Sequence, residues 1–208
     1  MKSIKSQTAH TKRFVGVGCF VLSLALIFIF VYNKSAASQP ALPTLAEKPQ
    51  KSTPQIIYGI PVRLKIPKIK VDAAIDAMGR KQNGDMEAPK GGIDVGWYKV
   101  GARPGNNGTA VMAGHYGQWA NGDGSVFDDL NKLQKGDNVY VEDEHGLTAT
   151  FVVRESKMYQ SGQDAPSVFD YASDGKAYLN LITCQGDWNE SQKSYSDRLV
   201  VFTDKTDK

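Results

Sequence analysis

The sequence predicts a mostly β domain, a small sandwich or barrel, behind one apolar segment near the N-terminus. After Tyr58-Gly59, short apolar runs are separated by Gly, Pro, Asn and Asp, which is typical of an all-β fold. Before that point, residues 14–32 form a long apolar stretch without a charge. Of the 208 residues, 41% are hydrophobic and 23% are charged, as in globular proteins. We therefore expect one folded domain and an anchor.

The apolar stretch 14–32 has the length of a membrane-spanning helix. At about 1.5 Å per residue, it matches a hydrocarbon core of about 30 Å. Residues 1–13 contain basic but no acidic residues, so the positive-inside rule predicts a cytoplasmic tail and an extracellular remainder. A cleaved signal peptide is the alternative, because Ser35-Ala36-Ala37 offers small residues to a peptidase, but the stretch exceeds the usual length of about 7 to 15 residues. We predict an uncleaved single-pass anchor in the cell membrane.

Residues 33–57 are predicted to be a Pro-rich extracytoplasmic linker, and residues 58–208 the folded domain. Five of the 25 basic residues and none of the 22 acidic residues lie before residue 35, so the rest carries a formal charge of −2. No stripe of Lys and Arg with interleaved aromatic residues is present in that part. The sequence therefore does not indicate a nucleic-acid partner.

The apolar runs of the domain predict seven strands and two short helical segments. A hairpin turn is expected at Asp143-Glu144-His145-Gly146, and helical turns at 126–133 and 167–172, where Leu, Phe and Val recur at helical spacing. The predicted strands are Val62–Ile66, Ala73–Met78, Thr109–Ala113, Asn138–Glu142, Ala149–Lys157, Ala177–Thr183 and Arg198–Thr203.

Cys184 ends a mostly apolar run that begins at Tyr178, and the segment 185–187 is expected to break the strand there. It is the only cysteine outside the apolar N-terminal stretch, so the domain has no internal disulfide. A lone cysteine in an apolar strand is more often a buried small hydrophobe than a nucleophile. The position at a strand end favours the nucleophile.

Two further residues complete a candidate catalytic set. His115 follows an apolar run at the start of a Gly-rich loop, whereas His145 lies in a charged turn, where a solvated role is expected. Arg198 begins the last predicted strand, fourteen positions after Cys184, and that strand can pair antiparallel with the strand of the cysteine. The alternative for Arg198 is an ion pair with Asp197 or another surface carboxylate. Because a thiol that attacks an amide needs a base and a fixed donor for the oxyanion, the three residues together predict cysteine acyl transfer.

Other chemistries are less well supported. Two histidines and one cysteine do not make a zinc site of the usual spacing, and no Gly-x-Ser-x-Gly elbow indicates a serine hydrolase. A calcium site of loop acids is an alternative, although we expect these acids to lie in solvated turns: Asp123, Asp128, Glu142, Asp143 and Glu144. We expect neither a metal nor a cofactor.

The flanks of the three candidates carry a family resemblance. The segment Asn180-Leu181-Ile182-Thr183-Cys184, with Ala113-Gly114-His115 upstream and Asp197-Arg198-Leu199-Val200-Val201 downstream, resembles the sortases, membrane-anchored cysteine transpeptidases of Gram-positive-type bacteria. The resemblance covers about 58–204, and Asn180 departs from the family signature Thr-Leu-x-Thr-Cys at its first position. Three segments look most like class F: Gly96-Trp97-Tyr98, Arg103-Pro104-Gly105 and Ala110-Val111-Met112-Ala113-Gly114-His115.

The resemblance implies a closed eight-stranded β-barrel with short helices. It implies that Cys184 attacks the Thr-Gly amide of an LPxTG-like sorting signal on a secreted protein, and that an amine of a lipid-linked peptidoglycan precursor resolves the thioacyl enzyme. His115 would be the acid and base, and Arg198 would hold the substrate and polarise its carbonyl. Two alternatives remain: a membrane-bound cysteine peptidase of the same fold, and a non-catalytic surface-binding barrel in which Cys184 is inaccessible to iodoacetamide.

Overall fold

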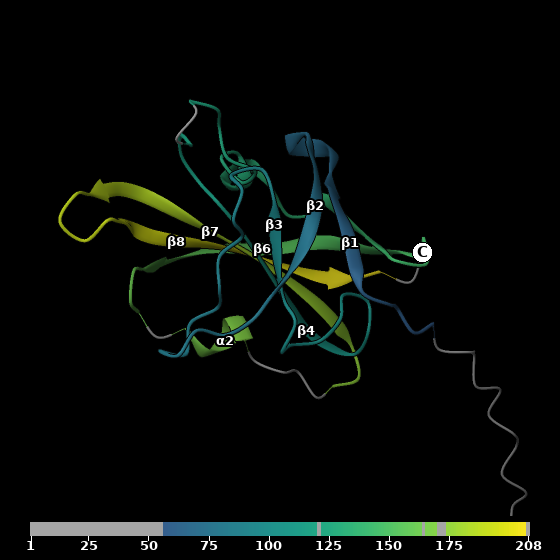
Figure 1. The fold of residues 1–208 in the computed structure, drawn as a ribbon. Helices are drawn as coiled ribbons and strands as arrows, with labels where there is room; N and C mark the ends of the chain where they lie inside the picture. Colours follow the sequence, from purple (N-terminus) through teal and green to yellow (C-terminus); the bar gives the residue numbers. More distant parts are fainter. Residues whose placement is uncertain (1–55, 120–121, 164, 170–173, 207–208) are drawn as a thin grey trace, which may run out of the picture. The chain divides into compact units, whose positions relative to one another are not determined.

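The computed structural model describes residues 56–119, 122–163, 165–169 and 174–206 (Figure 1). The predicted cytoplasmic tail 1–13, the predicted anchor 14–32 and nearly all of the predicted linker 33–57 lie outside the described residues. Within the described ranges, no helix has the length and apolar character needed to cross a membrane.

Eight strands close into a β-barrel in the order β1-β2-β3-β4-β7-β8-β6-β5, as the resemblance implied. The pairs β2–β3 and β4–β7 are parallel and the other pairs are antiparallel, so the barrel is mixed. The strands are β1 (Pro61–Ile66), β2 (Val71–Met78), β3 (Val95–Tyr98), β4 (Gly108–Gly114), β5 (Asn138–Asp143), β6 (Thr148–Gln160), β7 (Ala177–Asn189) and β8 (Ser194–Lys205).

Strand β3 is the one that the sequence pattern missed. Its four residues are all buried, so no alternation of apolar and polar residues marks it. Gly96 lies in its middle, where a Cβ atom would come within 2.5 Å of the Cγ atom of Met78. A short strand with a central glycine therefore gives no periodic signal, although the glycine is what allows the side chain of Met78 on β2 to pack there.

Both predicted helical segments contain a helical turn, and the one at 126–133 is shorter than predicted. The segment 126–133 contains the 3-10 helix η2 (Leu130–Lys132), and the segment 167–172 overlaps the α-helix α2 (Pro166–Phe169), beyond which residues 170–173 are not described. A further 3-10 helix, η1 (Pro67–Ile69), connects β1 and β2. Each of η2 and α2 buries a single apolar side chain, so one turn is enough to cover the barrel where it lies.

Strands β7 and β8 extend well past their predicted ends. The break predicted at 185–187 is wrong, because β7 continues to Asn189, and Arg198 does not begin the last strand, because β8 starts at Ser194. A register shift between Gln185 and Trp188 accommodates Gly186, whose φ of 85° belongs to the left-handed region. The two strands therefore leave the barrel as a long hairpin, drawn in yellow-green at the left of Figure 1.

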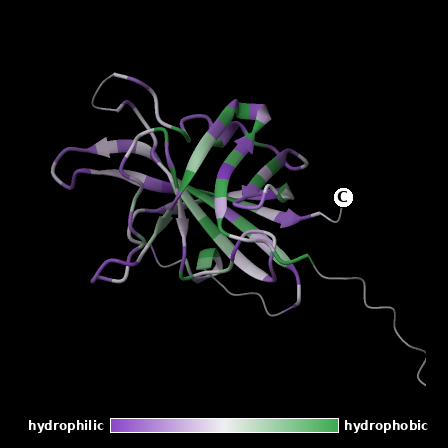
Figure 2. Ribbon diagram, turned by 45° about the vertical axis from the view of Figure 1, so that its right-hand side comes forward, coloured by the Kyte–Doolittle hydropathy of each residue, from purple (hydrophilic) through white to green (hydrophobic). Residues whose placement is uncertain are grey.

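The residues of β7 alternate between the two sides of the barrel wall. Leu179 and Leu181 have no exposed surface and belong to the main core. Full burial of each such side chain contributes about 1.5–3 kcal/mol to stability. Ile182 faces outward into a second cluster beneath α2, formed with Val168, Val200, Phe202, Tyr159 and Ala165. Figure 2 shows the same alternation of hydrophobic and hydrophilic residues along the strands. Cys184, two residues after Ile182, faces outward as well.

Candidate active site

Cys184 lies on the outer face of β7, just beyond the last residue pair that β7 makes with β4, Ala113 with Ile182. It is a free, half-buried cysteine. Burial raises the pKa of the Cys184 thiol, and the positive charge of Arg198 acts in the opposite direction without cancelling the effect. At neutral pH the thiol is therefore mainly protonated, and it needs a base to become a nucleophile.

Arg198 is the direct register partner of Cys184 across the β7–β8 ladder, as the spacing of fourteen residues predicted. Its Nη1 donates to the carbonyl oxygens of Tyr195 at 3.1 Å and Asp197 at 2.8 Å, and its Nη2 donates to Ser194 Oγ at 3.0 Å. These bonds fix the guanidinium plane beside the thiol. Within the described residues, Arg198 forms no ion pair with a carboxylate, so the surface ion pair with Asp197 is not found. Of its five N–H donors, two remain for another acceptor.

His115 follows the last residue of β4, on the strand that neighbours β7. The Oγ1 atom of Thr183 donates to the carbonyl oxygen of Gly114 at 2.9 Å and fixes the register between the two chain segments at this level. Because the pairing Ala113 with Ile182 is parallel, two further steps on each chain lead to His115 and Cys184. The three candidates therefore lie at the same height on three neighbouring segments of the barrel wall: His115 after β4, Cys184 on β7 and Arg198 on β8.

The ring of His115 is held from two sides. Its Nε2 atom lies 2.8 Å from the carbonyl oxygen of Pro89, in the segment between β2 and β3. Since a carbonyl can only accept, Nε2 carries a proton and Nδ1 is the nitrogen left to accept one. On the other side, the Trp119 ring lies with its centroid 4.7 Å from that of His115, at an interplanar angle of 51°. Sequence reasoning missed both Pro89 and Trp119 as neighbours of the histidine.

Asp128 organises the loop that follows His115. Its carboxylate accepts hydrogen bonds from the backbone N–H groups of Gly117 at 2.7 Å and Ser125 at 2.9 Å. The hydroxyl of Ser125 donates to the carbonyl of Gly117 at 2.6 Å. The expectation of a solvated acid is therefore wrong for Asp128. The Ser-x-x-Asp spacing of residues 125–128, which is the signature of a capping box, is a signal that could have identified it.

The β7–β8 hairpin packs against the same loop. The rings of Tyr116 and Tyr195 meet edge to face with centroids 5.2 Å apart, and a Cβ atom on Gly117 would collide with the Tyr195 hydroxyl. Gln185 Nε2 lies 3.2 Å from the hydroxyl oxygen of Tyr116, whereas the buried Gln185 Oε1 has no hydrogen-bond partner among the described residues. The hairpin thereby connects the segment that bears Cys184 with the loop that bears His115.

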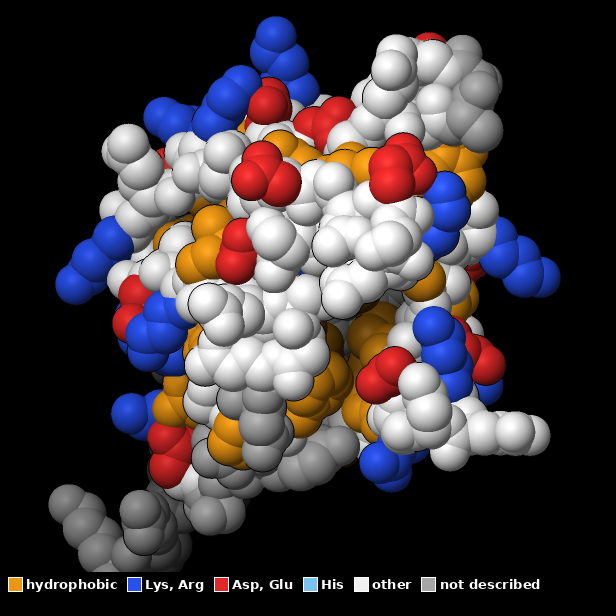
Figure 3. All heavy atoms as spheres, turned by 90° about the vertical axis from the view of Figure 1, so that its left-hand side faces the viewer, with side chains coloured by type: hydrophobic (Ala, Val, Ile, Leu, Met, Phe, Trp, Pro, Cys, Tyr) orange, Lys and Arg blue, Asp and Glu red, His pale blue; other side chains and the backbone are white. Residues whose placement is uncertain are grey.

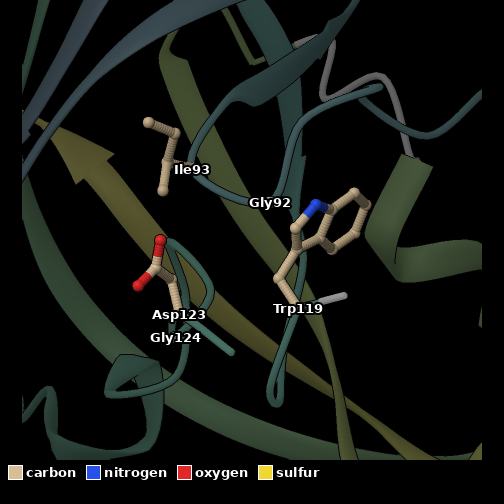
Figure 4. Close-up of a pocket in the computed structure, with 5 residues that line it drawn as sticks. All are labelled: Gly92, Ile93, Trp119, Asp123 and Gly124. Carbon is tan, nitrogen blue, oxygen red and sulfur yellow. The ribbon is translucent and has the colours of Figure 1, made fainter. Parts of the chain in front are cut away.

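A hollow of about 170 Å³ lies beside the histidine loop (Figure 4). It is lined by Gly92, Ile93, Trp119, Asp123 and Gly124, and Cys184 is not part of its wall. Figure 3 shows the face toward which the β7–β8 hairpin projects, where hydrophobic side chains lie in a depression with acidic and basic side chains around it.

The remaining sequence candidates lie elsewhere. His145 occupies the predicted β5–β6 turn, is 64% exposed in its side chain and lies 3.8 Å from Glu144 Oε1. The turn is also far from Arg198 along the barrel. Arg198 pairs with Tyr159 on β6, and Tyr159 is eleven residues from Thr148, the first residue of β6 after the turn, which is about 35 Å at 3.3 Å per residue. His145 is therefore solvated and outside the site. Among the described residues, no three His, Cys, Asp or Glu side chains come together to hold a metal ion.

Asp143 is not in a solvated turn either. Its carboxylate is buried and accepts hydrogen bonds from the backbone N–H groups of Gly59, His145 and Leu147 at 2.7, 2.9 and 2.8 Å. Burial raises the pKa of Asp143, but the three hydrogen bonds outweigh it, so the pKa lies below the ordinary value. This acid holds the β5–β6 turn against the residues that precede β1.

Comparison with known protein families gives one match over most of the chain. A family model described as the sortase domain matches residues 64–206, which include all three candidates. No curated protein matches the sequence.

Solved structures share the fold at low sequence identity. Sortase C-1 from Actinomyces oris is 24% identical, with a TM-score of 0.56 and coverage of 90% of this chain and 99% of its own. Sortase C1 of Streptococcus agalactiae, in complex with MTSET, is 22% identical, with a TM-score of 0.55 and coverage of 92% of both chains. A lid mutant of sortase A from Corynebacterium diphtheriae is 20% identical, with a TM-score of 0.56 and coverage of 90% and 95%. These neighbours are named as sortases C and A and give no specific support for class F.

Proposed function

The chain belongs to the sortase family of cysteine transpeptidases, and on that premise we propose that it cleaves the Thr-Gly bond of an LPxTG-like sorting signal and transfers the protein to a cell-wall amine. The observation that carries the proposal is the register pairing of Cys184 with Arg198, at the level where His115 follows the end of β4. A nucleophile, a fixed cationic donor and a base thus belong to adjacent chain segments, which is the set that acyl transfer requires.

In the first half-reaction, Cys184 is the nucleophile. His115 Nδ1 takes the thiol proton, and the sulfur attacks the threonine carbonyl carbon of the sorting signal. Arg198 has two N–H donors that are not bonded within the hairpin, and these stabilise the developing oxyanion. The guanidinium keeps its charge throughout. The C–N bond then breaks, and the proton on His115 goes to the departing glycine amine. The product is a thioester between Cys184 and the threonine.

In the second half-reaction, the incoming amine attacks the thioester carbon and His115 accepts a proton from it. The C–S bond breaks, an amide forms, and the proton on His115 returns to the thiolate of Cys184. No cofactor enters these steps. Water in place of the amine gives a carboxylic acid, which is the peptidase alternative.

The proposed location follows from the proposed anchor. We propose that residues 14–32 span the cell membrane, with the N-terminus in the cytoplasm and the barrel outside. Secreted proteins with a C-terminal sorting signal and lipid-linked peptidoglycan precursors both reach that surface. Within the family, we propose class F on the segments Gly96-Trp97-Tyr98 and Arg103-Pro104-Gly105.

The test is a cleavage assay on the full-length chain in detergent, with Cys184→Ala as the control. A quenched LPxTG-type peptide is incubated with and without an amine acceptor, and the products are identified by mass spectrometry. We expect an amine-ligated product that needs Cys184. Hydrolysis alone would support the peptidase, and no cleavage across a library of sorting motifs, together with a Cys184 that iodoacetamide does not alkylate, would support the binding module.

A further inference from the structure

We propose that Trp119 is a positioning residue of the transpeptidation: its indole holds the ring of His115 in one orientation and stabilises the imidazolium that forms when the ring takes up a proton. The inference rests on the proposed function, and Trp119 belongs to none of the motifs that carry the family resemblance. The contact with His115, the support of the indole and the charge that His115 gains each favour this role.

The single hydrogen bond of the His115 ring does not fix the ring plane. Its Nε2 atom lies 2.8 Å from the carbonyl oxygen of Pro89, but Nε2 is nearer than Nδ1 to the axis about which the ring turns, so this bond resists a turn only weakly. The indole of Trp119 covers one side of the ring, with the centroids 4.7 Å apart, and blocks a turn in that direction. Nδ1 is the atom that must reach the Cys184 thiol, and a displacement of about 1 Å in a reacting group can cost about a hundredfold in rate.

The indole is itself fixed on the segment between β2 and β3. A Cβ atom on Gly92 would lie 2.8 Å from the indole Cδ2 and 2.9 Å from Cγ, so a residue without a side chain is what lets the indole lie there (Figure 4). Val126 N donates to the carbonyl oxygen of Gly92 at 2.9 Å, and Trp119 N donates to that of Asp123 at 2.7 Å. The backbone on both sides of the indole is therefore held by hydrogen bonds.

The indole also faces the charge that His115 gains in the reaction. In a Ser-His-Asp triad, a carboxylate orients the histidine and stabilises its charged form. Among the described residues, no carboxylate forms an ion pair with His115. A cation within about 6 Å of an aromatic centroid is attracted to the ring, and tryptophan attracts it most. The carbonyl of Pro89 and the indole of Trp119 are thus the groups that meet the imidazolium.

The kinetic test compares Trp119→Leu with Trp119→Phe in the full-length chain, with a quenched LPxTG-type peptide. We expect Trp119→Leu to lower kcat about tenfold at unchanged KM, because the ring loses its orientation and the cation its aromatic face. Trp119→Phe keeps an aromatic face and should lose no more than about threefold. Both replacements are apolar, so equal kcat values in the two variants would mean that Trp119 is only an apolar cover, and would overturn the inference.

Neighbouring glycines provide a matched pair that leaves Trp119 in place. Gly92→Ala should displace the indole and lower kcat, again about tenfold. Gly91→Ala is the control, because a Cβ atom there would meet only the side chain of Asp94, whose carboxylate can move aside, and it should keep the wild-type rate. Equal rates in Gly91→Ala and Gly92→Ala would contradict the proposed role.

A fluorescence titration makes the result independent of catalysis. A protonated imidazole quenches the emission of an indole that it contacts, and a neutral one quenches it much less. Tryptophan emission of the full-length chain should therefore fall as the pH is lowered through the range in which histidine titrates, about pH 8 to 5. The fall should be absent in His115→Gln and in Trp119→Phe, and present in His145→Ala, whose ring is exposed in the β5–β6 turn.

The two measurements separate the inference from the proposed function. The expected fall in emission would support the contact between Trp119 and the imidazolium even where no peptide is cleaved, an outcome that would count only against the proposed function. A fall that persists in His115→Gln or in Trp119→Phe, or the absence of a fall in the unaltered chain, would overturn the inference.

Discussion

The β5–β6 turn and the β7–β8 hairpin each connect two antiparallel strands of the barrel, but they differ in how far their polar groups are hydrogen-bonded. In the turn, both oxygens of the Asp143 carboxylate accept backbone N–H groups, and the residue is only 3% exposed. In the hairpin, the Cys184 thiol is half-buried, Gln185 Oε1 has no partner among the described residues, and Arg198 keeps two donors for another acceptor. Satisfied groups stabilise a fold, and unsatisfied ones at one place indicate a site prepared for a ligand.

The two regions also differ in the direction of their pKa shifts. Burial alone raises the pKa of both acids, because it disfavours the charged form. Three N–H donors reverse the effect at Asp143, whereas the single positive charge of Arg198 does not reverse it at Cys184. At neutral pH the Asp143 carboxyl is therefore charged, whereas the Cys184 thiol is mainly protonated. Variants in the hairpin should change the activity and leave the stability unchanged. Variants in the turn should change the stability and leave the activity unchanged.

The largest effect is expected for His115→Ala. Loss of the general acid and base should lower the rate of sorting-signal cleavage about a thousandfold or more, since such groups contribute about 10²–10⁴ in rate. The midpoint of chemical denaturation should not change. His145→Ala is the matched control, because that ring lies exposed in the β5–β6 turn, and it should retain full activity. Substantial residual turnover in His115→Ala would remove this residue as the acid and base.

A smaller loss, about a hundredfold in kcat, is expected for Arg198→Lys. A lysine cannot reproduce a planar fork that binds Tyr195 O, Asp197 O and Ser194 Oγ and still presents donors to the oxyanion. Arg154→Lys on β6, where Arg154 pairs with Asp204, is the control and should leave the rate unchanged. Wild-type rates in Arg198→Lys would mean that this arginine only orders the hairpin. The hairpin would then not differ from the β5–β6 turn in having a functional charge.

The neighbourhood of Cys184 and Arg198 could be predicted from sequence because strand pairing follows from two apolar runs at a short separation. What the sequence did not reveal is that the ladder continues through Gly186. A glycine in a strand can end it or bulge it, and the outcome depends on Ser196 and Asp197 across the ladder, against which a Cβ on Gly186 would collide. This is tertiary information that a local pattern does not contain.

The surroundings of His115 were missed for a related reason. Pro89 acts through its backbone carbonyl, and a carbonyl is present at every position, so no residue type indicates it. Trp119 contacts the histidine through a loop whose path depends on Asp128 and Ser125. Four-residue β3 carries no alternation at all. The sequence thus predicted the candidate residues, whereas the groups that hold them in place became visible only in the fold.

Asp143→Asn should destabilise the barrel without changing the rate. The amide has one acceptor oxygen, so at least one of the three N–H groups loses its partner in a buried turn, at a cost of about 1–3 kcal/mol. Because the folded-state pKa of Asp143 lies below the unfolded value, its contribution is present above about pH 4 and is lost as the pH falls further. The difference in denaturation free energy between wild type and variant should therefore be constant near neutrality and shrink in acid.

The control for that measurement is Asp72→Asn. Asp72 forms a surface ion pair with Arg63 at 2.6 Å, with both side chains about half exposed, and solvent screens such pairs strongly. Its loss should not measurably change the denaturation midpoint. Equal destabilisation by Asp72→Asn and Asp143→Asn would show that the buried carboxylate stabilises the barrel no more than a surface ion pair does. The β5–β6 turn would then have no special structural role.

The smallest effect concerns the electrostatic coupling within the hairpin. Burial raises the pKa of the Cys184 thiol and Arg198 offsets part of that rise, so Arg198→Gln should raise the pKa further. Since iodoacetamide reacts with the thiolate, the pH profile of alkylation in the full-length chain should lie above that of an ordinary cysteine and move to still higher pH in Arg198→Gln. Lys193→Gln at the exposed hairpin end, where Lys193 pairs with Glu190, is the control and should leave the profile in place. A profile that Arg198→Gln lowers would mean that the guanidinium is not directed at the sulfur, and the hairpin would then resemble the β5–β6 turn in having a purely structural charge.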